Sequence, residues 1–272
     1  MFSFTDSEQP IQLYHIGSNS VQCFRLTPHK ELKSYIYYYW WLNVLPGNTT
    51  LEVIPDNATD LVMSPEIRDF SILYLPSTEK FAIPLTGPTT YVGISFNAAA
   101  AARFFNLSLE AMSQCSPGED TTNTLMVSEF VDGIQNLKHP EQLAPVLDNL
   151  AAARLLKKPL PTADRFKLNI DKALAAMQAS VGARGMESVA EHFGLSDRQF
   201  RRVMASLFGY GPKKVQRVMR LQAALNEILT TDAAKLDDGF FDEAHKIKEL
   251  RALTGLTPGQ LRKMAEIYNS LP

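Results

Sequence analysis

The pattern of apolar and polar positions divides the chain into two parts. Residues 10–96 carry short apolar and aromatic runs separated by turn signals, such as LPGN at 45–48, IPDN at 54–57 and TGP at 86–88. Short runs bounded by Gly, Pro and Asn are typical of β-strands. From Ala98 onward the apolar residues recur at helical spacing instead. The pattern predicts an α+β chain, with a mainly β N-terminal domain followed by helices.

Helices are predicted at 98–105, 127–137 and 141–156, with Pro145 in the first turn of the last one. The last helix carries a nearly continuous apolar face, whose residues are Leu143, Val146, Leu147, Leu150 and Leu155. Such a face needs a partner. Two partners are equally open: a second copy of the chain, giving a homodimer through residues 127–157, or the chain's own β domain.

The sequence KKPLPTADR at 157–165 interrupts the helical pattern with two prolines and several polar residues. This composition is typical of an interdomain linker. We therefore expect an N-terminal domain over residues 1–160 and a C-terminal domain over residues 165–272. Beyond the linker the short helical segments end at glycines such as Gly194 and Gly255, which predicts an all-α domain.

The charge of the whole chain, −2, conceals a difference between its halves. Residues 165–272 contain 17 Lys and Arg against 12 Asp and Glu, a net charge of +5. Residues 1–164 contain the other 10 basic and 17 acidic side chains, a net charge of −7. The basic C-terminal half is therefore the candidate for binding a polyanion.

Two helices in immediate succession are predicted within residues 186–209, MESVAEHFGLSDRQFRRVMASLFG. The apolar stripe of the first helix consists of Met186, Val189, Ala190 and Phe193. Gly194 ends that helix, and Ser196 begins the next one. Because Gln199 follows Ser196 at the spacing of a capping box, Ser196 is predicted as the N-cap.

The second of these helices is predicted to present Arg198, Arg201 and Arg202 on one exposed side. A helix fits the major groove of DNA, and arginine pairs bidentately with guanine. These arginines are therefore the expected base contacts, and a merely solvated basic face is the alternative. Gln199 is a weaker candidate for a base contact, because a capping-box glutamine bends back to the backbone.

A third helix is predicted from Pro212 in GPKKVQRVMRLQAALNEIL. Cations along it can meet phosphates, which position a protein on DNA without reading its sequence. Ser196, at the start of the preceding helix, can also meet a phosphate. The expected phosphate contacts are therefore Ser196, Lys213, Lys214, Arg217 and Arg220.

These motifs resemble the AraC/XylS family of transcription regulators. The resemblance rests on S-D-R-Q-F-x-R, G-x-G-P-K-K and R-L-Q-A-A-L, and on GFFDEAH and ELRALTGLTPGQLRK between residues 239 and 263. VIPDNATDLVMS and GISFNAAAAARFFN are similar to the sensor half of one subgroup, which has the pattern P-D-x-x-x-D-L. The resemblance implies two helix-turn-helix units joined by a long helix, each placing a helix in one of two successive major grooves.

The second unit departs from the family pattern. TTDAAKLDD at 230–238 is too short and polar for the usual apolar helix, and Lys246 occupies a position that is normally apolar. Acidic side chains that would repel phosphate are Asp232, Asp237, Asp238, Asp242 and Glu243. Lys248 is the expected base contact of this unit, ahead of His245. We predict that the second unit reads DNA poorly.

The aromatic run at 35–41 and the IPDN turn suggest a ligand pocket in the N-terminal domain. Its candidate residues are Tyr38, Trp40, Trp41, Asp56 and Asp60. Such pockets are mostly apolar with a few polar groups. Core packing is the alternative role for most of the rings, and turn formation for Asp56.

Other functional classes find little support in the sequence. The five histidines form no metal-binding pattern, the cysteines Cys23 and Cys115 have no C-x-x-C spacing, and Ser95 lies in an incomplete G-x-S-x-G. The longest apolar stretch is too short for a membrane helix, so a cytoplasmic protein without cofactor or metal is expected. We predict a non-enzymatic regulator that binds double-stranded DNA, with RNA polymerase and a small-molecule effector as further partners. The alternative is an interaction protein that has lost productive DNA binding.

Overall fold

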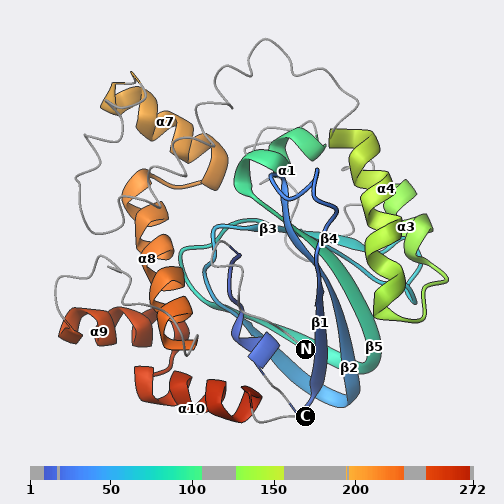
Figure 1. Cartoon of the computed structure of the whole chain (residues 1–272), viewed down its shortest axis with the longest axis horizontal. Coiled ribbons are helices and arrows are strands. Elements are labelled where there is room, and N and C mark those ends of the chain that lie inside the picture. The colour runs from blue at the N-terminus through green and yellow to red at the C-terminus, as the bar shows by residue number, and fades with distance from the viewer. Residues whose placement is uncertain are drawn as a thin grey trace.

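The computed structural model describes residues 9–16, 19–105, 127–155, 194, 196–229 and 243–269 (Figure 1). The N-terminal part is built on one antiparallel sheet with the strand order β1-β2-β5-β3-β4. The strands are β1 (Val21–Leu26), β2 (Ile36–Val53), β3 (Thr59–Met63), β4 (Ser71–Tyr74) and β5 (Phe81–Phe96). The expected mainly β domain is confirmed.

Most of the aromatic run lies in β2, where residues 38–41 are buried on the two faces of the sheet. Because side chains alternate along a strand, Tyr39 and Trp41 point to one face while Tyr38 and Trp40 point to the other. Trp40 pairs with Gly93 of β5, where an added Cβ would lie 2.2 Å from the indole ring. The glycine therefore provides the space that the Trp40 ring occupies.

Helices cover one face of this sheet. They are α1 (Ala98–Phe105), α3 (Ser128–Ile134) and α4 (Leu143–Leu155). The short helix η2 (Pro140–Gln142) directly precedes α4. The fully buried residues of α4 are Leu143, Leu147, Ala151 and Leu155, and they share a core with Tyr39 and Trp41. The chain's own β domain is thus the partner of the apolar face. Consequently, this face no longer argues for a homodimer.

The C-terminal part is helical throughout the residues that the structure describes there. It contains α7 (Asp197–Phe208), α8 (Pro212–Leu229), α9 (Glu243–Thr254) and α10 (Pro258–Asn269). The predicted linker at 157–165, the helix before Gly194 and the segment 230–238 lie outside the described residues. Within the described ranges, no helix has the length and apolar character that a bilayer span requires.

The helical part packs against the N-terminal part along α8 (Figure 1). Ile11, Leu13 of the short helix η1 (Leu13–Ile16) and Ile54 share one core with the C-terminal helices. The helical members of that core are Leu221, Ala224, Leu225, Leu229, Leu250, Leu253 and Leu261. Burial of apolar surface therefore stabilises the junction between the two parts.

Candidate nucleic-acid interface and apolar cavity

The start of α7 is fixed by a capping box. Ser196 Oγ accepts a hydrogen bond from the Gln199 amide at 3.3 Å, and the Gln199 side chain accepts one from the Ser196 amide at 2.9 Å. The helix ends at Gly209, whose φ of 77° is in the left-handed region. The predicted N-cap is confirmed. Because the Gln199 side chain takes part in this capping box, Gln199 can contact a base only if its hydrogen bond with the Ser196 amide breaks.

Arg198, Arg201 and Arg202 all lie on the exposed side of α7. The opposite side is buried and consists of Phe200, Val203, Met204, Leu207 and Phe208. Arg201 Nε forms an ion pair with Asp197 at 2.8 Å, with both side chains half exposed. An exposed pair of this kind is worth at most about 1 kcal/mol, so it does not prevent Arg201 from engaging another acceptor.

The cations of α8 fall into two groups. Lys213 and Lys214 are exposed in its first turn. Arg217 is bound to Glu249 of α9 through two hydrogen bonds, of 2.6 and 3.2 Å. These bonds raise the pKa of Arg217 and lower the pKa of Glu249. Burial lowers the pKa of the half-buried Arg220.

Helix α9 belongs to the irregular second unit. Lys246 is buried, and its Nζ lies 2.5 Å from a carboxylate oxygen of Glu227 on α8. A charged pair thus occupies the place of the apolar contact that the resemblance implies. His245, Lys248 and Arg251 remain on the exposed side of α9. The acidic residues at 232–242 lie outside the described residues, as does the side chain of Glu243.

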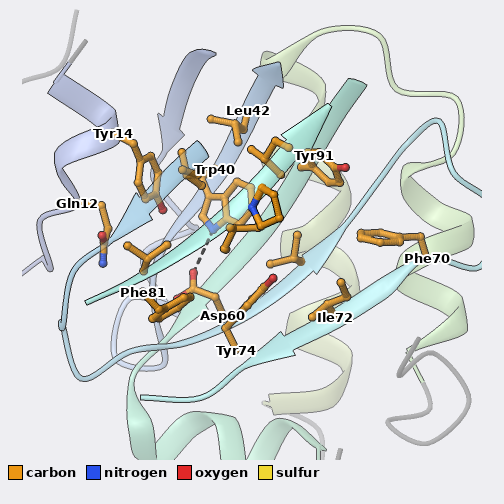
Figure 2. A pocket seen from close by; sticks show the side chains of 16 residues that line it. Gln12, Tyr14, Trp40, Leu42, Asp60, Phe70, Ile72, Tyr74, Phe81 and Tyr91 are labelled. Carbon is orange, nitrogen blue, oxygen red and sulfur yellow. Dashed lines mark hydrogen bonds between the residues drawn. The ribbon is translucent and has the colours of Figure 1, made fainter. Parts of the chain in front are cut away.

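The sheet face opposite α3 and α4 contains a cavity of about 190 Å³ (Figure 2). Its wall is mainly aliphatic and aromatic, and its polar lining groups come from Gln12, Tyr14, Trp40, Asp60, Tyr74 and Tyr91. Trp40 Nε1 donates a hydrogen bond to Asp60 Oδ1 at 3.1 Å, shown dashed in Figure 2. The rings of Tyr74 and Phe81 stack with centroids 5.7 Å apart. This is the composition of a site for a small organic molecule.

Two carboxyl groups lie close together at this site. Burial raises the pKa of the Asp60 carboxyl to about 8, and repulsion by Asp56 adds to the rise. Burial also raises the pKa of Asp56, although hydrogen bonds from Gln12 at 2.7 Å and from the Ala58 amide at 2.9 Å oppose this effect. Asp60 is therefore largely protonated at neutral pH. Among the described residues, no group of three or more His, Cys, Asp or Glu could hold a metal ion.

The five predicted pocket residues differ in their positions. Trp40 and Asp60 line the cavity, whereas the buried Tyr38 and the half-buried Asp56 lie nearby without lining it. Trp41 lies on the other face of β2 in the helix-covered core, so its inclusion was wrong. Asp56 also forms the predicted turn, and Asn57 has a φ of 60°.

Most lining residues were not predicted. Gln12 and Tyr14 reach the cavity from the N-terminal segment, and Phe70, Tyr74 and Phe81 come from the β4–β5 region. Because side chains alternate along a strand, Ile72 and Tyr74 of β4 are expected to share one face of the sheet. No local signal brings Gln12 to the same place.

The loop at 54–58, between β2 and β3, joins the cavity to α8. Asn57 Nδ2 donates to the Val215 carbonyl at 3.2 Å, and the Tyr210 hydroxyl donates to Asn57 Oδ1 at 2.7 Å. Gln222 Nε2 donates to the Pro55 carbonyl at 2.7 Å, and Gln222 Oε1 accepts from the Ile11 amide at 2.7 Å. The loop that carries Asp56 is therefore held directly by the helical part.

Gln12 connects these contacts to the cavity. Its side chain lines the cavity and exchanges two hydrogen bonds with the backbone of Ile54, of 2.8 and 3.0 Å. It also donates to Asp56, as described above. A molecule in the cavity would thus contact a residue that holds the loop bonded to α8.

Two family models match separate parts of the chain. Residues 189–264 match a helix-turn-helix domain, and residues 24–115 match a domain of unknown function, DUF6597. The C-terminal part is therefore a helix-turn-helix domain, a class of domain that binds DNA. A search of curated protein sequences found no match.

Several solved structures are similar to the chain. An AraC-type DNA-binding domain protein from Chromobacterium violaceum is 22% identical over 36% of this chain and 93% of its own, with a TM-score of 0.33. An apo variant of ToxT from Vibrio cholerae is 7% identical over 90% and 97%, with a TM-score of 0.43. Wild-type ToxT bound to an unsaturated fatty acid is 8% identical over 91% and 96%, also with a TM-score of 0.43.

Proposed function

We propose that the protein is a non-enzymatic transcription regulator of the AraC type, which binds double-stranded DNA in a sequence-specific manner and responds to an effector. The observation that carries the proposal is the capped helix α7 with its three exposed arginines, within a chain segment that matches a helix-turn-helix domain. The motifs quoted above from residues 196–225 and 239–263 support the AraC assignment.

Base reading falls to α7 in this proposal. Arg198 and Arg202 are exposed, and Arg201 can exchange its exposed ion pair for a guanine edge. Gln199 contributes only if it leaves the capping box. In the second unit, Lys248 on the exposed side of α9 is the proposed base contact.

Phosphate contacts are proposed for Ser196 at the start of α7 and for Lys213 and Lys214 at the start of α8. Arg217 and Arg220 are weaker candidates than the sequence alone suggested. Arg217 is neutralised by Glu249, and Arg220 is half-buried. The ion pair of Arg217 with Glu249 connects α8 to α9.

Effector control rests on the physical connection between the cavity and α8. The cavity residue Gln12 and the loop at 54–58 form hydrogen bonds with each other, and this segment in turn is bonded to Tyr210, Val215 and Gln222. Any molecule that favours one arrangement of the loop would also favour one placement of α8. Contact with RNA polymerase and location in the cytoplasm remain predictions from the sequence. Assembly as a homodimer also remains a prediction, but the apolar face that suggested it is buried on the sheet.

The direct test measures DNA binding by variants of the α7 arginines. Arg198→Ala, Arg201→Ala and Arg202→Ala should each weaken binding to a selected site by about 1–3 kcal/mol where the arginine makes a bidentate base contact. Fluorescence anisotropy measures the affinity for that site and for a scrambled duplex, and the difference between the two is the sequence-specific part of the binding free energy. Arg68→Ala, at an exposed position of the β domain, is the matched control. Unchanged specific binding by all three α7 variants would reject the recognition-helix assignment.

The alternative function, an interaction protein without productive DNA binding, is favoured by one observation. In the second unit, Lys246 and Glu249 form ion pairs with α8 instead of an apolar contact or a free surface. If the folded protein binds no DNA but changes the DNA binding of another regulator, this alternative replaces the first proposal.

A further inference from the structure

The cavity of the β domain has an unusually aromatic wall. Six of its lining side chains are rings: Tyr14, Trp40, Phe70, Tyr74, Phe81 and Tyr91. Figure 2 shows several of them around the Trp40–Asp60 hydrogen bond. The volume of about 190 Å³ exceeds the roughly 150 Å³ of an engineered apolar cavity that accepts benzene. The space therefore suits one ring with a short side chain.

The lining of this cavity contains an acidic side chain but no basic one among the described residues. Asp60 is the acidic group, and it is the one carboxyl of the described lining. The charge of Arg25 lowers the pKa of both Asp56 and Asp60, but its guanidinium lies over the Tyr38 ring at 3.7 Å and donates to the Pro10 carbonyl at 2.7 Å. Within the described ranges, Arg25 makes no ion pair within 4 Å with Asp56 or Asp60. Among the described residues, neither carboxyl therefore has an ion-paired counterion, although Arg25 acts on both from farther away.

An anionic ligand would find no cation in the described wall and would favour the protonated form of Asp60, so it would be buried without an ion pair. A neutral ligand would bury its apolar part but would leave the carboxyls as they are. A cation would supply the absent counterion, and its positive charge would be attracted to the faces of the surrounding rings. The chemistry of the wall therefore selects for positive charge.

We propose that this cavity binds a small aromatic amine in its ammonium form, with the ammonium group against the Asp60 carboxylate and the apolar body against the rings. The proposal rests on effector control by the β domain and names the chemical class of that effector.

The test compares three probes of similar shape on the full-length protein by titration calorimetry. They are 2-phenylethylamine, the neutral 2-phenylethanol and the anionic 3-phenylpropanoate. Wild type should bind the amine at least about tenfold more tightly than either other probe, a difference of about 1.4 kcal/mol. Asp60→Asn should bring the affinity for the amine down to that for the alcohol. Asn can still accept the Trp40 hydrogen bond, so the variant keeps the wall intact.

Asp69→Asn is the matched control, because Asp69 is an exposed carboxyl on the same domain. It should bind all three probes as wild type does. Equal binding of amine and alcohol by wild type would overturn the proposal, as would an amine preference that survives in Asp60→Asn. Failure of wild type to bind the amine at millimolar concentration would also overturn it.

The pH dependence of binding provides an independent readout. The ionisable and charged groups facing Asp60 are Tyr14 of η1, Arg25 of β1, Tyr38 of β2 and Asp56 of the loop. Trp40 donates the hydrogen bond to Asp60, and Ser95 lies opposite Asp60 on β5. Because the pKa of Asp60 in the empty cavity is about 8, binding an ammonium ion below that pH must release a proton. The affinity for the amine should therefore rise, by up to about tenfold per pH unit, from about pH 6 to 8.

The alcohol should show no such rise, and neither should the amine with Asp60→Asn. A pH-independent affinity of wild type for the amine would contradict ion pairing with Asp60. These titrations contain no DNA, so their outcome is separate from that of the anisotropy measurements. Amine binding without DNA binding would reject only the proposal that the protein is a DNA-binding regulator. DNA binding without a preference for the amine would reject only the proposal that the cavity binds an aromatic amine.

Discussion

At the scale of single residues, the cavity depends on a close approach between two strands. Trp40 can lie against β5 because its cross-strand partner is Gly93. An added Cβ there would overlap the indole ring, which could move only by displacing the Trp40–Asp60 hydrogen bond. A glycine in a strand usually weakens it. Here it is required by the side chain opposite.

Gly93→Ala should therefore lower the free energy of unfolding by about 1–3 kcal/mol, the usual cost of overpacking a core. Denaturant unfolding followed by tryptophan fluorescence measures the change. Gly259→Ala is the control, because no atom lies within 4 Å of a Cβ added at Gly259. If the two variants are equally stable, the close approach of Trp40 to β5 is not a constraint on the fold.

Local sequence signals predicted some of these residues and not others. Ser196 and Gln199 are three positions apart, so their capping box follows from the sequence alone. Strand alternation separates Trp40 from Trp41, but the sequence does not show which face carries the cavity. The pairing of Arg217 with Glu249 joins residues 32 positions apart, and no local pattern reveals it.

At the scale of the elements, α8 serves both parts of the chain. It carries Lys213 and Lys214 at one end, contacts the β domain along its length and binds Glu249 of α9. Its 18 residues span about 27 Å at 1.5 Å per residue, comparable with the roughly 34 Å of one turn of DNA. α7 and α9 thus lie toward opposite ends of a helix of suitable length.

The cations of α8 should differ in their effect on salt dependence. Removing a phosphate contact lowers the slope of log affinity against log salt concentration by about one. Lys213→Ala and Lys214→Ala should each show this loss, while Arg217→Ala should leave the slope nearly unchanged because Glu249 already neutralises the guanidinium. Binding titrations at several salt concentrations check both statements. If the slope of Arg217→Ala also falls by about one, the ion pair between Arg217 and Glu249 opens when the protein binds DNA.

The helices and strands themselves were largely predictable, because periodicity and capping are local. The partner of the apolar face of α4 was not predictable in this way. The sequence left a second copy of the chain and the β domain as equal candidates, and the structure buries the face on the sheet. The choice depends on the tertiary fold, since an apolar stripe specifies burial without specifying its partner.

At the scale of the whole molecule, the β domain and the helix-turn-helix domain share a core and a set of hydrogen bonds. Asn57 and Gln222 are the side chains that make most of these bonds. If they transmit the state of the cavity, 2-phenylethylamine should change the DNA affinity of wild type by about fivefold or more, the lower end of typical allosteric coupling.

The double variant Asn57→Ala/Gln222→Ala should lose this coupling while it still binds the amine, because neither side chain lines the cavity. DNA affinity with and without the amine, combined with calorimetry on the variant, separates coupling from binding. A variant that retains the full coupling would show that the signal takes another route.

Sequence-specific DNA recognition by α7 is the central claim, and selection of bound duplexes from a random library by the purified full-length protein tests it most directly. We expect a two-part site: one sharply defined half read by residues 196–207, and a degenerate half about one helical turn away, because the second unit has a charged pair in place of an apolar contact. Equal information in both halves would show that the second unit is a competent reader. Failure to enrich any sequence would contradict the claim itself.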